Sequence, residues 1–285
     1  MPETLAARLR AIAARLAAAG VPNPVVDAEL LAGHVLGLSR GGVQAAVVRG
    51  DALTDADAAA LDALAARRAA REPLQHLTGT AAFRHLELAV GPGVFVPRPE
   101  TETVVQFAID ALLSSPDEAP IAVDLGTGSG AIALAMATEV PHARVFAVEL
   151  SEAAHAWAAR NVAGTENLTL VHGDLATALP ELDGTVAVVV SNPPYVPDDA
   201  VPRDPEVRLF DPAQALYGGA DGLDVVRVIS RRAAELLRPG GMLVLEHGEL
   251  QGEAIRGILT GDGWRAPATH QDLTRRDRAT TALRA

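Results

Sequence analysis

The sequence contains no cysteine, few aromatic residues and no apolar run long enough to cross a bilayer. The absence of cysteine excludes disulfides, a thiolate zinc site and a cysteine nucleophile, and it fits a reducing cytoplasm. No His-Glu-x-x-His or other metal-ligand spacing occurs, so we expect no metal site. The net charge is −12, whereas a protein that mainly grips bare phosphate backbone is usually basic.

The 285 residues fit one large domain or two unequal ones. Residues 1–76 predict a helical domain, because Leu5, Leu9 and Leu16 recur at helical spacing. In the same region, Thr54 and Asp57 form a capping box. Residues 77–99 predict a β-hairpin and a connector, because their apolar residues partly alternate and are interrupted by Gly-Pro-Gly at residues 91–93.

Residues 100–285 predict an α/β, Rossmann-like domain with a seven-stranded sheet. After residue 120, strands and helices alternate, which favours a mainly parallel sheet with helices on both faces. The expected strands are residues 121–125, 144–148, 168–171, 186–190 and 242–245, followed by two closing strands around Trp264 and Thr281.

A stiff corner follows the expected strand 186–190, formed by Asn192, Pro193, Pro194 and Tyr195. Proline restricts its own backbone and that of the residue before it, and ligands bind at the carboxyl ends of such strands. The Asn192 side-chain oxygen and the Pro193 carbonyl could accept both hydrogens of an –NH2 group, while the Tyr195 ring lies against a planar group. The alternative is a proline-rich turn with asparagine as turn former.

A glycine loop follows the expected strand 121–125 and precedes a helix. It consists of Gly126, Thr127, Gly128, Ser129 and Gly130. Such a loop allows close approach of a ligand to the backbone, with helix N–H groups behind it. Glu149, at the end of the next strand, would bind ribose hydroxyls in either a nicotinamide or an S-adenosyl-L-methionine site. Alternatively, the glycines serve only tight strand–helix packing.

Two features favour S-adenosyl-L-methionine over a dinucleotide. Asp124 precedes the glycines, where a carboxylate can take an α-amino group, and a hydride-transfer enzyme needs no nitrogen-binding corner. Asp174 would then meet the adenine edge, and Leu175 would pack on the adenine face. A solvated loop aspartate and a core leucine are the alternatives.

The connector, residues 97–102 (Pro-Arg-Pro-Glu-Thr-Glu), precedes an amphipathic helix. It is either a linker with acids near a helix N-terminus or a segment that faces the substrate.

These motifs together resemble the release factor glutamine methyltransferase family, also called the HemK/PrmC type, over nearly the whole length. The matching segments are residues 27–31 (Asp-Ala-Glu-Leu-Leu), 72–79 (Glu-Pro-Leu-Gln-His-Leu-Thr-Gly), the connector, residues 124–130, the corner and residues 245–248 (Leu-Glu-His-Gly). Three positions differ from the family pattern: Glu149 is often aspartate in relatives, Leu175 can be aromatic, and residues 272–278 lack an expected glycine.

The resemblance implies methylation of the glutamine side-chain amide in the Gly-Gly-Gln loop of peptide chain release factors, with S-adenosyl-L-methionine as cofactor. By matching position, the glycine loop, Glu149 and Asn192 would contact the cofactor. The corner would hold the glutamine, and the helical domain would help to dock the release factor. We expect a cytoplasmic monomer without direct nucleic-acid or membrane partners.

Two other functions remain open at this point. An enzyme that methylates exocyclic amines in nucleic acid, of the adenine-N6 type, would share the corner but should carry a basic face or a target-recognition domain. A non-catalytic adaptor that retains the fold is the second.

Overall fold

The computed structural model describes residues 4–285, and residues 1–3, with which the expected helical domain begins, lie outside the described part. The chain forms two compact units. The first contains the chain up to Thr80 together with Arg203–Phe210, and the second contains Ala81–Pro202 and Asp211–Ala285. The backbone therefore passes from one unit to the other after Thr80, after Pro202 and after Phe210.

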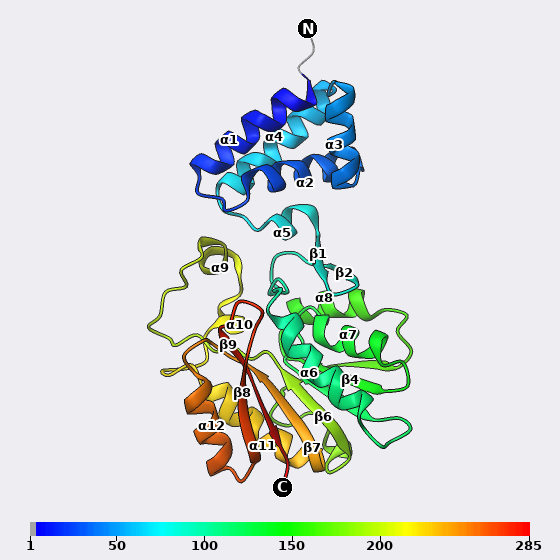
Figure 1. Ribbon diagram of the computed structural model, residues 1–285, viewed down its shortest axis with the longest axis vertical. Coiled ribbons are helices and arrows are strands. Elements are labelled where there is room, and N and C mark those ends of the chain that lie inside the picture. The colour runs from blue at the N-terminus through cyan, green and yellow to red at the C-terminus, as the bar shows by residue number, and fades with distance from the viewer. Residues whose placement is uncertain (1–3) are drawn as a thin grey trace. The chain divides into compact units, whose positions relative to one another are not determined.

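The first unit is helical, as the apolar spacing predicts (Figure 1). Its helices are α1 (Leu5–Ala18), α2 (Pro24–Leu36), α3 (Arg40–Arg49), α4 (Asp55–Ala69), α5 (Leu74–Thr78) and α9 (Pro205–Phe210). The predicted capping box is present at the start of α4, where Thr54 Oγ1 accepts from Asp57 N at 3.1 Å and donates to Asp57 Oδ2 at 2.7 Å. Helix α3 was not predicted, because it buries only Val43 and Ala46 and so has a weak apolar stripe.

A buried ion network joins α9 to the helical unit. Arg68 on α4 donates to Asp27 Oδ2 at 2.7 Å and to Glu206 Oε1 at 2.8 Å, and Arg71 bonds both oxygens of Glu206. Burial alone would raise the pKa of Glu206, but hydrogen bonds from Arg71, Asp204 and Arg68 lower it to about 2. The network explains how a helix far along the sequence belongs to the N-terminal unit.

We predict that Glu206→Ala lowers the free energy of unfolding of the helical unit by about 3 kcal/mol, because it removes the anion that Arg68 and Arg71 share and leaves only Asp27 beside Arg68 and the more exposed Asp204 beside Arg71. The depressed pKa fixes the pH dependence. The contribution of Glu206 is complete above its unfolded pKa of about 4.3 and is lost as the pH falls towards 2. Urea titrations read by hydrogen exchange of α2 and α4 peptides measure this change.

Arg49→Ala is the matched control, because the Arg49–Asp51 pair has side chains 59% and 42% exposed. Its loss should cost less than about 1 kcal/mol. Equal losses for the two variants would contradict the assignment of the network as a stabilising element.

The second unit contains a seven-stranded sheet in the order β5-β4-β3-β6-β7-β9-β8, and β9 alone runs antiparallel to the other strands of this sheet. This confirms the α/β class and the strand number. Its strands are β3 (Ile121–Leu125), β4 (Arg144–Glu149), β5 (Leu168–His172), β6 (Val186–Ser191), β7 (Leu237–Glu246), β8 (Arg265–Gln271) and β9 (Asp277–Leu283).

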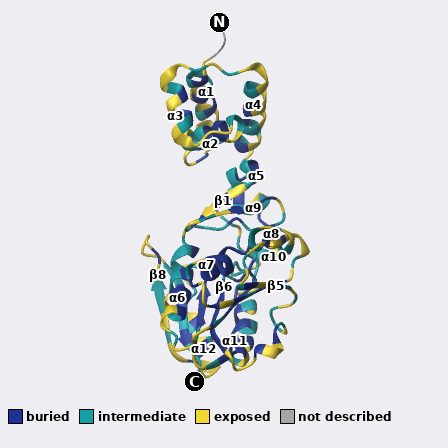
Figure 2. Ribbon diagram, turned by 90° about the vertical axis from the view of Figure 1, so that its right-hand side faces the viewer, coloured by how far each residue is buried: buried dark blue, intermediate teal, exposed yellow. Residues whose placement is uncertain are grey.

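Helices cover both faces of this sheet, and its central strands are buried (Figure 2). One face packs against α6 (Thr101–Leu113), α7 (Ala131–Glu139) and α8 (Glu152–Val162). The other face packs against α11 (Asp224–Leu236), α12 (Gly252–Gly261) and the 3-10 turn η1 (Pro180–Leu182). The short helix α10 (Ala213–Leu216) completes the unit. This two-sided burial explains why β6 is an almost continuous apolar run and why β3 is apolar except for Asp124.

The hairpin consists of β1 (Thr80–Phe83) and β2 (Leu86–Ala89). Its turn lies at residues 84–85, so the expected interruption at residues 91–93 is not the hairpin turn. Arg84 there has a φ of 53°, and its guanidinium bonds Gln106 and Glu139, which compensates for the strained backbone. Gly91 instead gives room for the Trp157 ring. No helix within residues 4–285 is long and apolar enough to span a membrane.

Candidate active site

The glycine loop opens directly after β3. Gly126 and Gly128 have φ of 77° and 58°, and no atom lies within 4 Å of the position that a Cβ would take at either residue. The Gly126 and Thr127 amides both donate to the Val148 carbonyl at 2.9 Å, which anchors the loop to the end of β4. The loop is therefore a fixed cradle with free space on its open side.

The acid at the end of β4 is in contact with this loop. Glu149 accepts from Gly128 N and from Ser151 N, each at 2.8 Å. Each carboxylate oxygen keeps a further lone pair, so Glu149 can still accept from ribose hydroxyls. The structure thus brings together the glycine loop and Glu149, as the sequence predicts, while their contact with a cofactor stays a prediction.

Asp124, one residue before the end of β3, is fully buried. Its Oδ2 accepts from Thr127 Oγ1 at 2.5 Å, and the Ala133 backbone N–H lies close enough to lower the pKa of the carboxyl. Burial raises the pKa of Asp124 to about 7, although the Thr127 bond acts against this shift. A buried carboxylate is costly and keeps further acceptor lone pairs, so an ammonium group held beside the glycine loop would bond to it and offset the cost of its burial. The donor set therefore fits S-adenosyl-L-methionine.

The end of β5 lies beside Glu149, because Gly173 N donates to the Glu149 carbonyl at 2.9 Å. Asp174 Oδ1 accepts from Ala176 N at 2.8 Å in a tight turn. Leu175 is half-buried against the core cluster under α11 and α12. Both residues are near the cofactor edge of the sheet, and their contact with adenine stays a prediction.

The corner lies next to the glycine loop. Strand β6 pairs with β3, with Asp124 opposite Val190, and Ser191 Oγ donates to the Leu125 carbonyl at 2.5 Å. Tyr195 O accepts from Gln251 Nε2 at 2.9 Å. The backbone of Gly218 and Gly222 packs so closely on the corner that a Cβ at either would collide with its carbonyls. The corner is therefore held rigidly from several sides.

The corner presents two oxygen acceptors. Within residues 4–285, neither Asn192 Oδ1 nor the Pro193 carbonyl accepts a hydrogen bond. The Asn192 amide nitrogen instead donates to Thr101 Oγ1 at 3.4 Å. Burial raises the pKa of Tyr195 above its usual range, so its hydroxyl stays neutral. This arrangement agrees with the predicted binding of an –NH2 group and leaves the assignment itself a prediction.

Two residues at this site were not predicted, Thr101 and Glu246. Thr101, inside the connector, begins α6, and Glu246 ends β7. The Glu246 carboxyl is buried and accepts hydrogen bonds from the Thr101 and Asn192 side chains. An acid at the end of a buried strand is the same signal that pointed to Glu149, and it could have identified Glu246. The connector's substrate-facing role remains a prediction, and its contact with the corner is now observed.

Helix α8 supports the glycine loop from outside. Asn161 Nδ2 donates to Ser129 O at 2.9 Å and to Ala89 O at 3.0 Å, and its Oδ1 accepts from Ala89 N at 2.7 Å. The Asn161 side chain therefore links strand β2 of the hairpin to the glycine loop.

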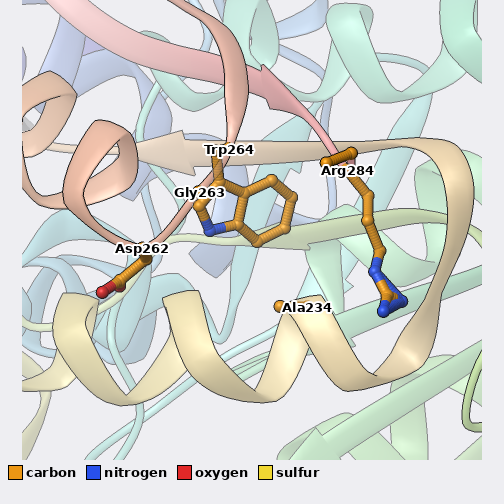
Figure 3. A pocket seen from close by; sticks show the side chains of 6 residues that line it. Ala234, Asp262, Gly263, Trp264 and Arg284 are labelled. Atoms are coloured by element: carbon orange, nitrogen blue, oxygen red, sulfur yellow. The ribbon is translucent and has the colours of Figure 1, made fainter.

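A pocket elsewhere in this unit does not coincide with the site (Figure 3). It lies where β7 begins, at the end of the strand opposite to Glu246, and none of the predicted site residues lines it. Trp264 there donates to Ser230 Oγ at 2.9 Å, which indicates a packing role. Residues 4–285 contain no cluster of acids and histidines that could hold a metal ion.

The fold, the glycine loop and the acid at the end of β4 define a methyltransferase that uses S-adenosyl-L-methionine. Two family models match the chain: "PrmC N-terminal domain" at residues 8–79 and "Methyltransferase domain" at residues 122–203. A release factor glutamine methyltransferase of Streptomyces coelicolor is 52% identical over 95% of this chain and 95% of its own length. Proteins of the same name from Mycolicibacterium smegmatis and Deinococcus radiodurans are 49% and 44% identical, over 97% and 95% of this chain and 96% and 95% of their own lengths. The chain belongs to the release factor glutamine methyltransferase family.

We predict that Glu149→Ala weakens cofactor binding about tenfold or more, because the variant loses a carboxylate that also orders the loop through Gly128 N. Isothermal titration with S-adenosyl-L-methionine measures the Kd. Glu152→Ala, an exposed acid in the first turn of α8, is the control and should bind as wild type does. Unchanged affinity in Glu149→Ala would exclude Glu149 from the cofactor site.

Proposed function

We propose that the protein transfers a methyl group to the side-chain amide N5 of the glutamine in the Gly-Gly-Gln loop of peptide chain release factors, in the cytoplasm. The observation that carries the proposal is the corner: two oxygen acceptors, Asn192 Oδ1 and the Pro193 carbonyl, lie beside a glycine loop that fits the cofactor.

The two acceptors suit a carboxamide nitrogen. An amide –NH2 group is planar and carries two hydrogens, so two fixed oxygens in one plane hold it in a single orientation. The Tyr195 ring can lie against the flat amide group. The corner is rigid before any ligand arrives, so little ordering is needed when the substrate binds.

An amide nitrogen is a poor nucleophile, because its lone pair is delocalised into the carbonyl. The bound cofactor would supply an electrophilic methyl group on a positively charged sulfur. The acceptors of Asn192 and Pro193 stabilise the positive charge that develops on the nitrogen, and one of its protons leaves after transfer. The chain's task is therefore positioning and electrostatic stabilisation.

Relatives support this substrate class. Proteins named release factor glutamine methyltransferase match this chain over nearly their full length in three distinct genera, and the match includes the helical unit as well as the catalytic one. A nucleic-acid enzyme would share the corner, but the net charge of −12 disfavours a phosphate-binding surface.

The direct test is incubation of the protein with a release factor and methyl-labelled S-adenosyl-L-methionine, followed by mass spectrometry. We expect one added methyl on the glutamine of the Gly-Gly-Gln loop and none on a release factor with alanine at that position. Single-stranded DNA serves as the competing substrate. Label on DNA, or none on the glutamine, would overturn the proposal.

Asn192→Ala should lower kcat about 100-fold, because it removes one of the two acceptors that act on the reacting nitrogen. Cofactor Kd should change little, since Gly126–Gly130 and Glu149 are intact. Asp199→Ala, an exposed acid further along the same loop, is the control and should keep full activity. Equal losses in turnover and in cofactor affinity would contradict the role assigned to Asn192.

A further inference from the structure

The Asn192 carboxamide poses a problem of orientation. Its oxygen and its –NH2 group are nearly the same size, so the group can turn over without a steric cost. In one orientation Oδ1 faces the substrate and accepts its N–H. In the other, two donors face a substrate –NH2 group, which repels them. The proposed reaction therefore requires a device that selects one orientation.

The structure contains acceptors placed on the nitrogen side of Asn192. Its amide nitrogen donates to Thr101 Oγ1 at 3.4 Å, and the Glu246 carboxyl accepts from Asn192 and from Thr101. Thr101 thus receives a bond from Asn192 and passes one to Glu246. The Asn192 amide nitrogen thus lies beside acceptors inside the protein, and Oδ1, which accepts no hydrogen bond within the described residues, is left for another partner.

We propose that Glu246, with Thr101 between it and the amide, is the positioning residue that fixes the Asn192 carboxamide with Oδ1 towards the substrate nitrogen. This inference rests on the proposed function, because it names the residues that make the corner selective for an –NH2 group.

The fold places Glu246 for this task. Strands β6 and β7 are parallel neighbours with Ser191 opposite Leu245, so Asn192 and Glu246 each follow one residue later. Thr101 is fixed as the first residue of α6 and is 4% exposed. The three side chains come from three separate segments, and packing determines their spacing.

Burial of Glu246 has no evident benefit for stability. The residue is 1% exposed, and within residues 4–285 its Oε2 has no hydrogen-bond partner. Arg278 lies close enough to interact electrostatically, but no ion pair between it and Glu246 is formed within the described residues. A buried acid with one oxygen unsatisfied is usually destabilising, and replacing it should cost little stability or increase it. A purely structural residue would behave in the opposite way.

The ionisation state of Glu246 decides which orientation it supports. An ionised carboxylate only accepts, so it selects the amide nitrogen, whereas a protonated one also donates and competes for Asn192 Oδ1. Burial raises the pKa of Glu246 to about 7; Glu100, ahead of α6, raises it further, while Thr101, Asn192 and Arg278 on β9 lower it. Tyr195 at the corner also faces this group and stays neutral. We therefore expect kcat to rise with pH through about 7.

The test compares Glu246→Ala and Glu246→Gln with wild type on a release factor. Glu246→Ala should lower kcat about tenfold or more, with cofactor Kd within about twofold and a Tm no lower than wild type. Glu246→Gln keeps an acceptor oxygen, so it should retain more activity, and its kcat should no longer change with pH near 7. Glu249→Ala, an exposed acid three residues away, should match wild type.

Thr101 gives a second, independent pair of variants. Thr101→Val removes the hydroxyl at constant shape and should lower kcat, while Thr101→Ser should restore it. Thr103→Val, the same change two residues along α6, is the control. Wild-type kcat in Glu246→Ala and Thr101→Val, or equal falls in kcat and Tm, would overturn the proposal.

A measurement without substrate separates this inference from the proposed function. The side-chain ¹⁵N–¹H signals of Asn192, assigned by their loss in Asn192→Ala, should shift with pH near 7 in wild type and stay constant in Glu246→Gln. If wild type fails to methylate the release factor but these signals titrate, the proposed function fails and the positioning network stands. If they do not titrate, the positioning role is excluded.

Discussion

The hydrogen bond from the Ser191 hydroxyl to the Leu125 carbonyl, 2.5 Å long and buried, joins the ends of β3 and β6. The glycine loop begins one residue after Leu125, and the corner begins one residue after Ser191. The spacing between the glycine loop and the corner is thus determined by the sheet itself. Catalysis of methyl transfer depends mainly on alignment, so this bond underlies the chemistry. Around this bond, Asn161 holds Ser129 of the glycine loop, and Thr101 of the connector contacts Asn192 of the corner.

Three acidic side chains lie close together at the active-site edge of the sheet, an arrangement that is energetically unfavourable. Asp124, Glu149 and Glu246 lie at the carboxyl ends of three strands, and parallel pairing aligns those ends. Burial raises the pKa of Asp124 and Glu246 to about 7, while Glu149 receives two backbone N–H groups instead. Burying these carboxyl groups lowers the stability of the fold, and the hydrophobic layers on both faces of the sheet offset that loss. Within this unit, the polar groups of the site therefore lie at the strand ends, and the residues that stabilise the fold lie on the two faces of the sheet.

The sequence predicted the parts of the fold that depend on local pattern. The apolar runs of β3 and β6, the glycine loop and the capping box of α4 all follow from neighbouring residues. The hairpin turn was misplaced, because Arg84 takes a positive φ that only distant partners such as Glu139 make acceptable. The contact of Thr101 and Asn192 with Glu246 could not be predicted either, since it joins segments brought together only by strand order, although the position of Glu246 at the end of a buried strand was a usable signal. The union of α9 with the N-terminal helices depends on the same kind of long-range information.

The helical unit is built from two stretches of chain, because Glu206 on α9 supplies the counter-charge for Arg68 and Arg71. The first stretch alone would retain Arg68 with only Asp27 as its counter-charge, and it would retain Arg71 without Asp204 and Glu206, which are encoded well beyond the glycine loop. Neither unit is thus a cassette that recombination could exchange through a single junction. A chimera between relatives that exchanges one unit would need matched breakpoints near residues 80, 202 and 210.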